Sequence, residues 1–134
     1  MKNIVLIALC SAMLVACKKE EGTGGDASIS GQVWTQRIAI NGTFSETVAE
    51  FPAEDTYVYI VYGDNTGFDK RIKTDYNGYF NFNYLYPGNY TLYVYSFDPY
   101  DEIDERSPVI RQVHIKERDE NVEIGRINIY ELQQ

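Results

Sequence analysis

The sequence contains few of the residues from which catalytic and metal centres are usually assembled. Of its 134 residues, two are cysteine and one is histidine. Both cysteines, Cys10 and Cys17, fall within the first 17 residues, so the rest of the chain can form neither a disulfide nor a cysteine-ligated metal site. With His114 as the only histidine, a nucleophile–base pair would have to be built from carboxylates. We therefore predict a protein that is not an enzyme and that binds no cofactor.

Long apolar runs are also missing. The longest, Ile4–Val15, has about a dozen residues, whereas a helix that spans a bilayer needs about 20. Lys2 precedes this run and the small residue Ala16 follows it, which is the pattern of a cleavable signal peptide. The sequence therefore predicts export of the chain and no membrane-spanning segment.

The residues that close the apolar run, Leu14-Val-Ala-Cys17, resemble a bacterial lipobox. This resemblance implies cleavage before Cys17 and attachment of lipid to its thiol and to the new amino terminus. Several acyl chains anchor a protein stably where one chain is marginal. The alternative is an ordinary secretory signal cut nearby, which would leave Cys17 as a free thiol. We expect a signal peptide over 1–16 and a lipidated Cys17.

Basic residues are in deficit. The chain carries 12 Lys and Arg against 20 Asp and Glu, a net charge of −8. Such a chain lacks the basic surface that nucleic-acid binding requires, and anionic lipid surfaces should repel it. We therefore predict no nucleic-acid partner, and contact with the membrane only through the lipid anchor.

Residues 17–28 are polar and rich in glycine, which predicts a flexible linker after the lipidated cysteine. Within it, Lys19-Glu-Glu21 resembles the export signal that carries some Gram-negative lipoproteins to the outer face of the outer membrane. This resemblance implies a cell-surface location. The alternative is a solvated linker with incidental charges, for which the periplasmic face remains open.

Residues 29–134 have the pattern of one all-β domain. Apolar and polar residues alternate over short runs separated by Gly, Asn, Asp and Pro, and no helical periodicity occurs. Asn41-Gly42 is typical of a type I′ hairpin turn, which needs positive φ at both central positions. The predicted strands cover residues 29–36, 37–40, 43–48, 56–62, 68–74, 79–83, 90–97, 109–115 and 122–130. We expect a Greek-key β-sandwich of about seven strands plus an inserted hairpin.

The last predicted strand changes phase in its middle. Val122 and Ile124 share one parity, whereas Ile127 and Ile129 have the other, and Gly125 lies between them. One extra residue on a strand reverses the faces to which its side chains point. A β-bulge at Gly125 would return all four apolar side chains to the core.

Four motifs occur in a characteristic order: Ile29-Ser-Gly-Gln-Val33, Tyr57–Val61, Thr74-Asp-Tyr-Asn-Gly-Tyr-Phe-Asn-Phe82 and Leu85-Tyr-Pro-Gly-Asn-Tyr-Thr-Leu92. Together they resemble the carboxypeptidase regulatory-like domain, a transthyretin-like β-sandwich. The resemblance covers most of residues 29–97; residues 98–130 fit only as closing strands, and residues 36–52 look like an insertion. These motifs determine the fold, so the resemblance implies architecture and not activity.

Each motif also has a physical role. Asp75 can accept hydrogen bonds from the backbone amides that follow it, and Gly78 supplies a positive φ. Phe80 and Phe82 share one face and should each contribute about 1.5–3 kcal/mol of apolar burial. Tyr90 begins a strand on the core side, where its hydroxyl needs a hydrogen-bond partner.

Two activities found in related domains do not fit these residues. Transthyretin-like hydrolases that act on ureides use several histidines, whereas His114 here lies among alternating strand residues and is expected to face solvent. Related surface domains join a lysine of the first strand to an asparagine of the last. Asn128 lies in the last predicted strand, but the first contains no lysine, so we discount this crosslink.

One predicted loop is crowded with carboxylates. Oxygen ligands at short spacing can hold Ca²⁺, but this spacing matches no standard calcium loop. We expect a solvated acidic loop and no metal, with a weak calcium site as the alternative. The residues are Asp98, Asp101, Glu102, Asp104 and Glu105.

Tyrosines alternate with aliphatic residues in two predicted strands. If Val58, Ile60, Leu92 and Val94 face the core, the tyrosines between them face outward, and neighbouring strands would then carry an exposed aromatic surface. Such a surface can stack on sugar rings or pack against a protein. The alternative is that tyrosine simply suits strands and that residues 36–52 cover this face. The candidate residues are Tyr57, Tyr59, Tyr93 and Tyr95.

From these observations we expect an outer-membrane lipoprotein with one β-sandwich that acts as a non-catalytic binding or assembly module. Its partner would be a protein or a glycan. Two other classes of function remain open. One is a glycan-binding accessory lipoprotein of an outer-membrane uptake system, and the other, the least favoured, is a weak metal-dependent hydrolase.

Overall fold

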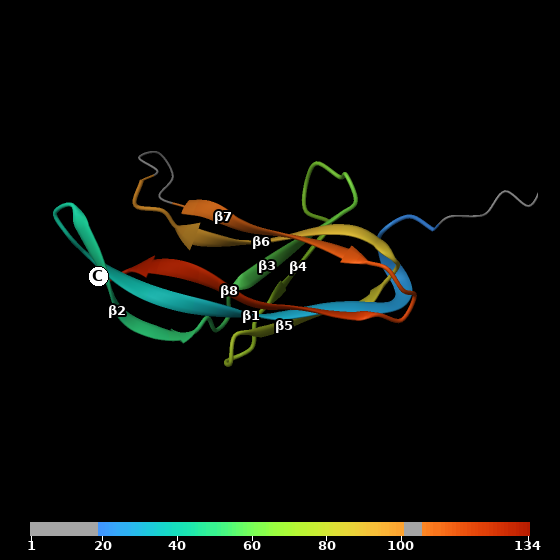
Figure 1. The fold of residues 1–134 in the computed structure, drawn as a ribbon, viewed down its shortest axis with the longest axis horizontal. Coiled ribbons are helices and arrows are strands. Elements are labelled where there is room, and N and C mark those ends of the chain that lie inside the picture. Colours follow the sequence, from blue (N-terminus) through green and yellow to red (C-terminus); the bar gives the residue numbers. More distant parts are fainter. Residues whose placement is uncertain (1–18, 101–105) are drawn as a thin grey trace, which may run out of the picture.

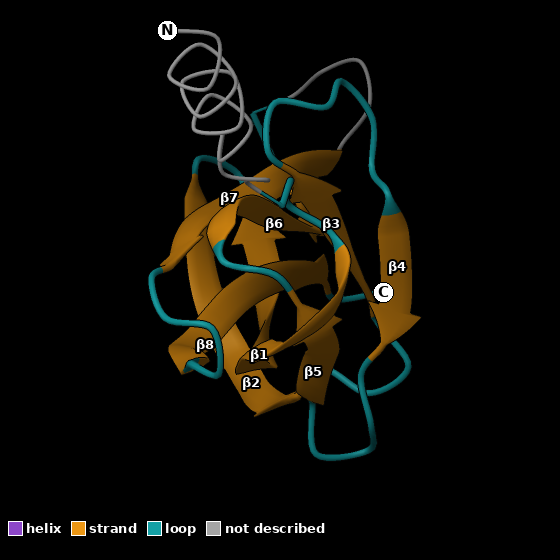
Figure 2. Cartoon of the chain, turned by 90° about the vertical axis from the view of Figure 1, so that its right-hand side faces the viewer, coloured by secondary structure: helices purple, strands orange, loops and turns teal. Residues whose placement is uncertain are grey.

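Eight strands form two stacked sheets in the computed structural model, which describes residues 19–100 and 106–134 (Figure 1). The predicted all-β sandwich is confirmed, and only strands and loops occur in these two ranges (Figure 2). The strands are β1 (Thr23–Asn41), β2 (Phe44–Pro52), β3 (Tyr57–Tyr62), β4 (Lys70–Lys73), β5 (Tyr79–Leu85), β6 (Gly88–Phe97), β7 (Arg106–Ile115) and β8 (Asn121–Leu132).

Some predicted features lie outside the described residues. They are the signal peptide over 1–16, the lipidation site Cys17, and four members of the acidic loop: Asp101, Glu102, Asp104 and Glu105. Within the described ranges, no helix has the length and apolar character that a membrane crossing requires.

The long strand β1 is the centre of the first sheet. It pairs antiparallel with β5 through its first half and with β2 through its second half, and parallel with β8 along its other edge. The second sheet has the order β4-β3-β6-β7, with every pair antiparallel. In Figure 1 the β1–β2 hairpin projects at one end, and the first described residues lie at the opposite end.

β1 begins earlier than predicted, at Thr23, and therefore occupies half of the expected flexible linker. The glycines there serve close packing: a Cβ on Gly25 would lie 2.1 Å from the carbonyl oxygen of Leu85. Ala27 is fully buried beside them. The predicted strands 29–36 and 37–40 are one continuous strand, and the expected inserted hairpin is its extension, paired with β2.

Apolar residues from both sheets fill the space between them. Tyr90 and Phe82 are buried, as predicted. The bulge at Gly125 is confirmed, because Ser30 pairs with Glu123 whereas Gln32 pairs with Arg126, and Gly125 has a φ of +73°. All four apolar residues of β8 consequently reach the core: Val122, Ile124, Ile127 and Ile129.

The turn before β5 has the predicted construction. The carboxylate of Asp75 accepts hydrogen bonds from the backbone N–H groups of Asn77 and Tyr79, both at 2.9 Å. Gly78 has a φ of +77°, and its carbonyl oxygen accepts a hydrogen bond from the Val33 N–H at 2.8 Å. This turn is therefore hydrogen-bonded to the middle of β1 at the point where β5 begins.

Replacement of Gly78 tests how much this close approach matters. A Cβ at Gly78 would lie 2.3 Å from the carbonyl oxygen of Val33, whereas a Cβ at Gly42, with a similar φ of +66°, meets nothing within 4 Å. Gly42→Ala should cost about 1–2 kcal/mol from backbone strain alone. Gly78→Ala should cost more, because the turn must also move away from β1. Chemical unfolding of both variants measures this difference; equal losses would contradict the packing described here.

Candidate functional site

The predicted tyrosines lie on the outer face of the second sheet. Val58 and Ile60 of β3, and Leu92 and Val94 of β6, are fully buried. Side chains alternate along a strand, so the tyrosines between these residues point away from the core. Tyr59 and Tyr93 are directly opposite each other in the β3–β6 pairing. We call the group of Tyr57, Tyr59, Tyr93, Tyr95 and Phe68 the tyrosine platform.

Tyr59 is the centre of this platform. Its ring stacks on Tyr93, with centroids 4.9 Å apart and planes 3° from parallel. Phe68 and Tyr95 approach Tyr59 edge to face, at 5.0 Å and 5.6 Å. The ring of Tyr57 is tilted against it at 6.2 Å. Tyr59 and Tyr93 therefore each bury one ring face against the other. The five rings form one packed cluster.

The platform is exposed although its rings pack together. The exposed fractions are 37% for Tyr57, 48% for Phe68 and 42% for Tyr95. On the adjacent strand, Ile110 pairs with Tyr93 and is 52% exposed. The alternative in which residues 36–52 cover this face is wrong, because β2 is hydrogen-bonded to β1 in the other sheet and leaves these rings accessible.

Two hollows border the platform. One, of about 410 Å³, lies over β6 and β7 and is lined by Tyr93, Tyr95 and Ile110 together with the residues that follow β3. The other, of about 830 Å³, lies at the end of the second sheet and reaches from Tyr57 and Tyr95 to Leu132. Tyr95 lines both hollows, so a ligand that crosses the platform can place side chains on either side of it.

Cationic groups flank one edge of the platform. The guanidinium of Arg71 lies over the ring of Tyr57, with its carbon 4.2 Å from the centroid. Lys73 lies 5.1 Å from the same centroid and forms a 2.8 Å salt bridge with Asp55. Hydrogen bonding to Asp55 raises the pKa of Lys73. Both cations come from β4, which pairs with β3 and so places them beside the tyrosines.

The phenol of Tyr93 remains protonated at neutral pH. Burial raises its pKa, and the neighbouring Tyr95 and Tyr59 raise it further. The platform therefore offers hydroxyl hydrogen-bond donors beside apolar ring edges and carries no negative charge from this group. Such surfaces are enriched in protein interfaces.

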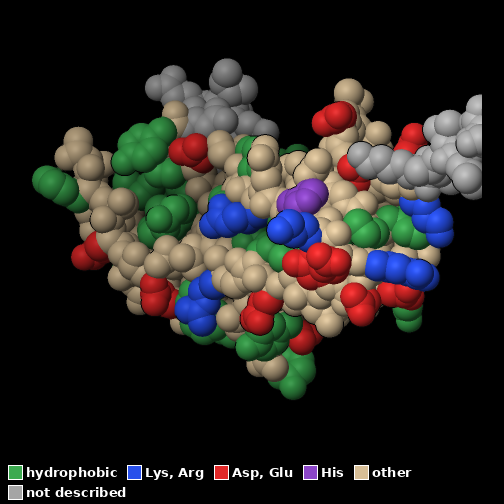
Figure 3. Space-filling model, turned by 45° about the vertical axis from the view of Figure 1, so that its right-hand side comes forward, with side chains coloured by type: hydrophobic (Ala, Val, Ile, Leu, Met, Phe, Trp, Pro, Cys, Tyr) green, Lys and Arg blue, Asp and Glu red, His purple; other side chains and the backbone are tan. Residues whose placement is uncertain are grey.

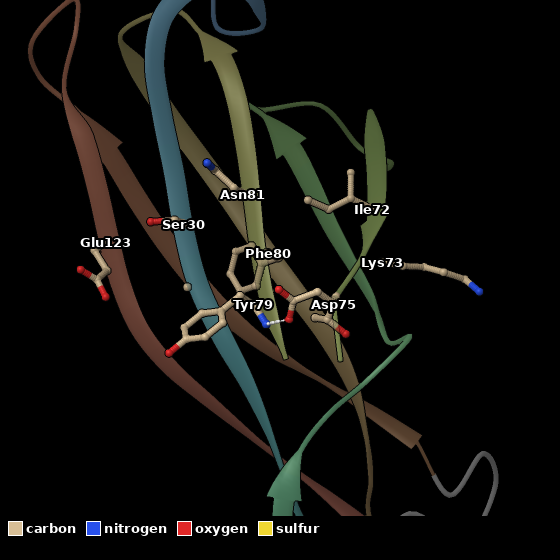
Figure 4. A pocket seen from close by; sticks show the side chains of 10 residues that line it. Ser30, Ile72, Lys73, Asp75, Tyr79, Phe80, Asn81 and Glu123 are labelled. Carbon is tan, nitrogen blue, oxygen red and sulfur yellow. Dashed lines mark hydrogen bonds between the residues drawn. The ribbon is translucent and has the colours of Figure 1, made fainter. Parts of the chain in front are cut away.

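The hollow shown in Figure 4 does not contain a reactive arrangement. It has a volume of about 610 Å³, lies between β4 and β5, and is lined by residues such as Ile72, Phe80 and Asn81. The Asp75 carboxylate already accepts two backbone hydrogen bonds, and Lys73 points away from the hollow (Figure 4). The carboxylate of Asp75 therefore stabilises a turn.

The predicted acidic loop is described only at Asp98. Its carboxylate accepts hydrogen bonds from the Tyr100 N–H at 3.0 Å and from the Ser107 hydroxyl at 2.9 Å. Asp98 therefore joins β6 to β7. Across residues 19–100 and 106–134, no three His, Cys, Asp or Glu side chains gather in a way that could hold a metal.

His114 is exposed on β7, and its Nδ1 lies 2.8 Å from the amide oxygen of Asn89. On the side of the molecule seen in Figure 3, acidic and basic side chains are interspersed, and hydrophobic side chains gather toward the projecting hairpin. This side has the mixed charge of a solvated surface.

Tyr90 fixes the first described residues to the sandwich. Its hydroxyl accepts a hydrogen bond from the Gly22 N–H at 3.0 Å and donates one to the Tyr86 carbonyl oxygen at 2.6 Å. Burial raises the pKa of Tyr90, with a smaller effect from Glu21. Nearby, the ammonium of Lys19 lies 4.8 Å from the centroid of the Tyr86 ring. The sequence predicted that the Tyr90 hydroxyl needs a hydrogen-bond partner. It did not predict that this partner is Gly22, because residues 17–28 were expected to form a flexible linker.

Comparison with known proteins finds only distant structural similarity. No protein-family model and no curated protein matches the chain. The minor pilin GBS52 of Streptococcus agalactiae is similar at a TM-score of 0.37 and 14% identity, over 78% of this chain and 46% of the pilin. A 9R-lipoxygenase from Cyanothece PCC8801 is similar at 0.36 and 14%, over 93% of this chain and 20% of the lipoxygenase. The chain therefore spans less than half the length of either protein.

Tyr90→Phe should destabilise the domain by about 1–3 kcal/mol, because the variant leaves the Gly22 N–H and the Tyr86 carbonyl without their partner. Tyr76→Phe is the matched control, since Tyr76 is 73% exposed on a turn. Urea unfolding measures both variants. Equal stability of the two would show that the Tyr90 hydroxyl contributes nothing.

Proposed function

We propose that the protein is a non-catalytic binding or assembly module of the cell envelope, and that a protein partner docks on the tyrosine platform. The observation that carries this proposal is the exposure of a packed ring cluster on a sheet face that residues 19–100 and 106–134 leave uncovered. Aromatic residues are enriched where proteins bind each other, and they carry much of the binding energy.

The ring geometry favours a protein over a glycan as the partner. A sugar stacks on a free ring face, whereas Tyr59 and Tyr93 stack on each other and Tyr95 meets Tyr59 edge to face. The cluster presents ring edges, hydroxyls and the aliphatic Ile110, flanked by two hollows that can accept side chains. A glycan-binding accessory role in an uptake system remains the second candidate, because Tyr57 and Tyr95 are partly exposed.

The resemblance to the carboxypeptidase regulatory-like domain concerns architecture and not activity. Its motif residues here serve the fold: Asp75 and Gly78 form a turn, and Phe82 lies in the core. Among the described residues, no three His, Cys, Asp or Glu side chains gather in a way that could hold a metal, so a metal-dependent hydrolase is the least supported alternative.

We place the protein on the outer membrane, held by lipid on Cys17 and facing the cell surface. The lipobox-like sequence and Lys19-Glu-Glu21 support this location. Four residues lie between Cys17 and Gly22, which is hydrogen-bonded to Tyr90. A chain of that length spans at most about 18 Å, so the anchor would hold the β5–β6 end of the sandwich near the bilayer.

Cys17→Ala should release the protein from membranes or leave it unprocessed, because the acylated residue would be lost. Fractionation of cells, with mass spectrometry of the amino terminus, measures this. Cys10→Ala is the control and should leave the anchor intact, since the signal peptide that contains it is removed. An unmodified mature amino terminus in the wild type would contradict the lipid anchor.

Photo-crosslinking tests docking on the platform. With p-benzoylphenylalanine at position 95, cells should yield one discrete protein adduct; at position 84, which is exposed on β5 of the first sheet, they should not. Tyr59→Ser should abolish the position-95 adduct, and because it removes four ring contacts it should also lower the free energy of unfolding by about 1–3 kcal/mol. The same adduct from position 84, or its persistence in Tyr59→Ser, would contradict platform docking. Tyrosine-dependent binding on a glycan array would favour the second candidate.

A further inference from the structure

The charges on the outer face of the second sheet have one sign, although the whole chain is acidic. Side chains that share this face with the tyrosines follow from the strand registers: Arg71 pairs with Tyr59, Lys73 with Tyr57, and Arg106 with Phe97. No strand residue facing outward on this sheet is acidic in the ranges 57–62, 70–73, 88–97 and 106–115. The carboxylates near this face lie at its margins: Asp64 lines the hollow beside Tyr93, and the hollow beside Tyr57 is lined by Glu54, Asp55 and Glu131. The outward-facing charged side chains of the strands themselves are therefore cationic.

Arg71 differs from its neighbour Lys73 because, among the described residues, it forms no salt bridge. Lys73 is held by Asp55 at 2.8 Å, whereas the guanidinium of Arg71 lies over the ring of Tyr57. The carboxylate of Asp69, two residues earlier in the chain, accepts hydrogen bonds from the Tyr62 N–H at 2.7 Å and from the Asn65 amide at 2.9 Å. A guanidinium held on an aromatic ring keeps its hydrogen-bond donors available for a carboxylate.

We propose that Arg71 and Tyr57 form a carboxylate-binding corner of the tyrosine platform, and that the partner is an acidic protein segment. Its Asp or Glu pairs with Arg71 while neighbouring apolar side chains cover Tyr59, Tyr93 and Tyr95. This inference rests on the proposed docking function and adds the chemistry of the partner to it.

A second copy of this chain is a poorer occupant. Two copies packed symmetrically through the platform would bring together two faces whose strand charges are all positive, which opposes association. An acidic polysaccharide could also supply carboxylates, but the stacked faces of Tyr59 and Tyr93 leave little ring surface for its sugars. The acidic protein segment satisfies both the charge and the ring geometry.

Selection of peptides tests this chemistry without knowledge of the natural partner. The probe is a library of random 12-residue peptides displayed on phage, selected in parallel against wild type and three variants. Arg71→Gln removes the charge at the proposed corner, and Tyr95→Ser removes a ring of the platform. Arg126→Gln is the matched control, because its guanidinium lies 4.0 Å from the centroid of the Trp34 ring on the other sheet.

Peptides selected on wild type and on Arg126→Gln should be enriched in Asp and Glu beside apolar residues. The enrichment in acidic residues should disappear on Arg71→Gln, and the selected peptides should bind that variant at least about tenfold more weakly than wild type. Acidic peptides that bind Arg71→Gln as tightly as wild type would overturn the inference.

Two further outcomes separate this inference from the docking function itself. Peptides without acidic enrichment that still require Tyr95 would overturn the acidic partner and leave platform docking intact. Peptides whose binding is unaffected by Tyr95→Ser would overturn both. Competition by an oligogalacturonate, with no peptide selected at all, would overturn the protein partner in favour of an acidic glycan.

Discussion

The register of one strand, β1, is the constraint on which the rest of the molecule depends. β1 is hydrogen-bonded to β2, β5 and β8, so it joins every strand of the first sheet. Its residues Ile29 and Val33 are fully buried, and between them Gly31 leaves room for the ring of Phe80. A shift of one residue would turn both apolar side chains to solvent. The bulge at Gly125 lets β8 follow this register along its whole length.

The tyrosine platform follows from the same arrangement. Because β2 pairs with β1, the hairpin extends the first sheet and leaves the outer face of the second sheet uncovered. The core takes the aliphatic residues of β3 and β6, so the alternating tyrosines must point outward, and the pairing of Tyr59 with Tyr93 stacks their rings. The sandwich thus produces an exposed aromatic surface on a rigid sheet, which suits binding because the rings are ordered before a partner arrives.

Alternation along single strands made much of this predictable from the sequence. It correctly places Val58 in the core and Tyr57 outside, and the phase change in β8 correctly indicates the bulge. The start of the domain was mispredicted, because Gly24-Gly25 has the composition of a flexible linker; only the structure shows Leu85 so close that side chains are excluded. The stacking of Arg71 on Tyr57 was not predicted either, since the pairing of β3 with β4 is not encoded in either strand alone.

The central claim is that a protein partner covers the tyrosine platform in the cell envelope. Hydroxyl-radical footprinting tests it directly, by comparing the oxidation of Tyr57 and Tyr95 in the purified domain and in intact cells. Tyr79 and Tyr84, which are exposed on β5 of the first sheet, provide the internal reference. The account predicts that Tyr57 and Tyr95 react in the purified domain and are protected in cells, while both references react equally in the two samples. Unchanged oxidation of the platform rings in cells would contradict it.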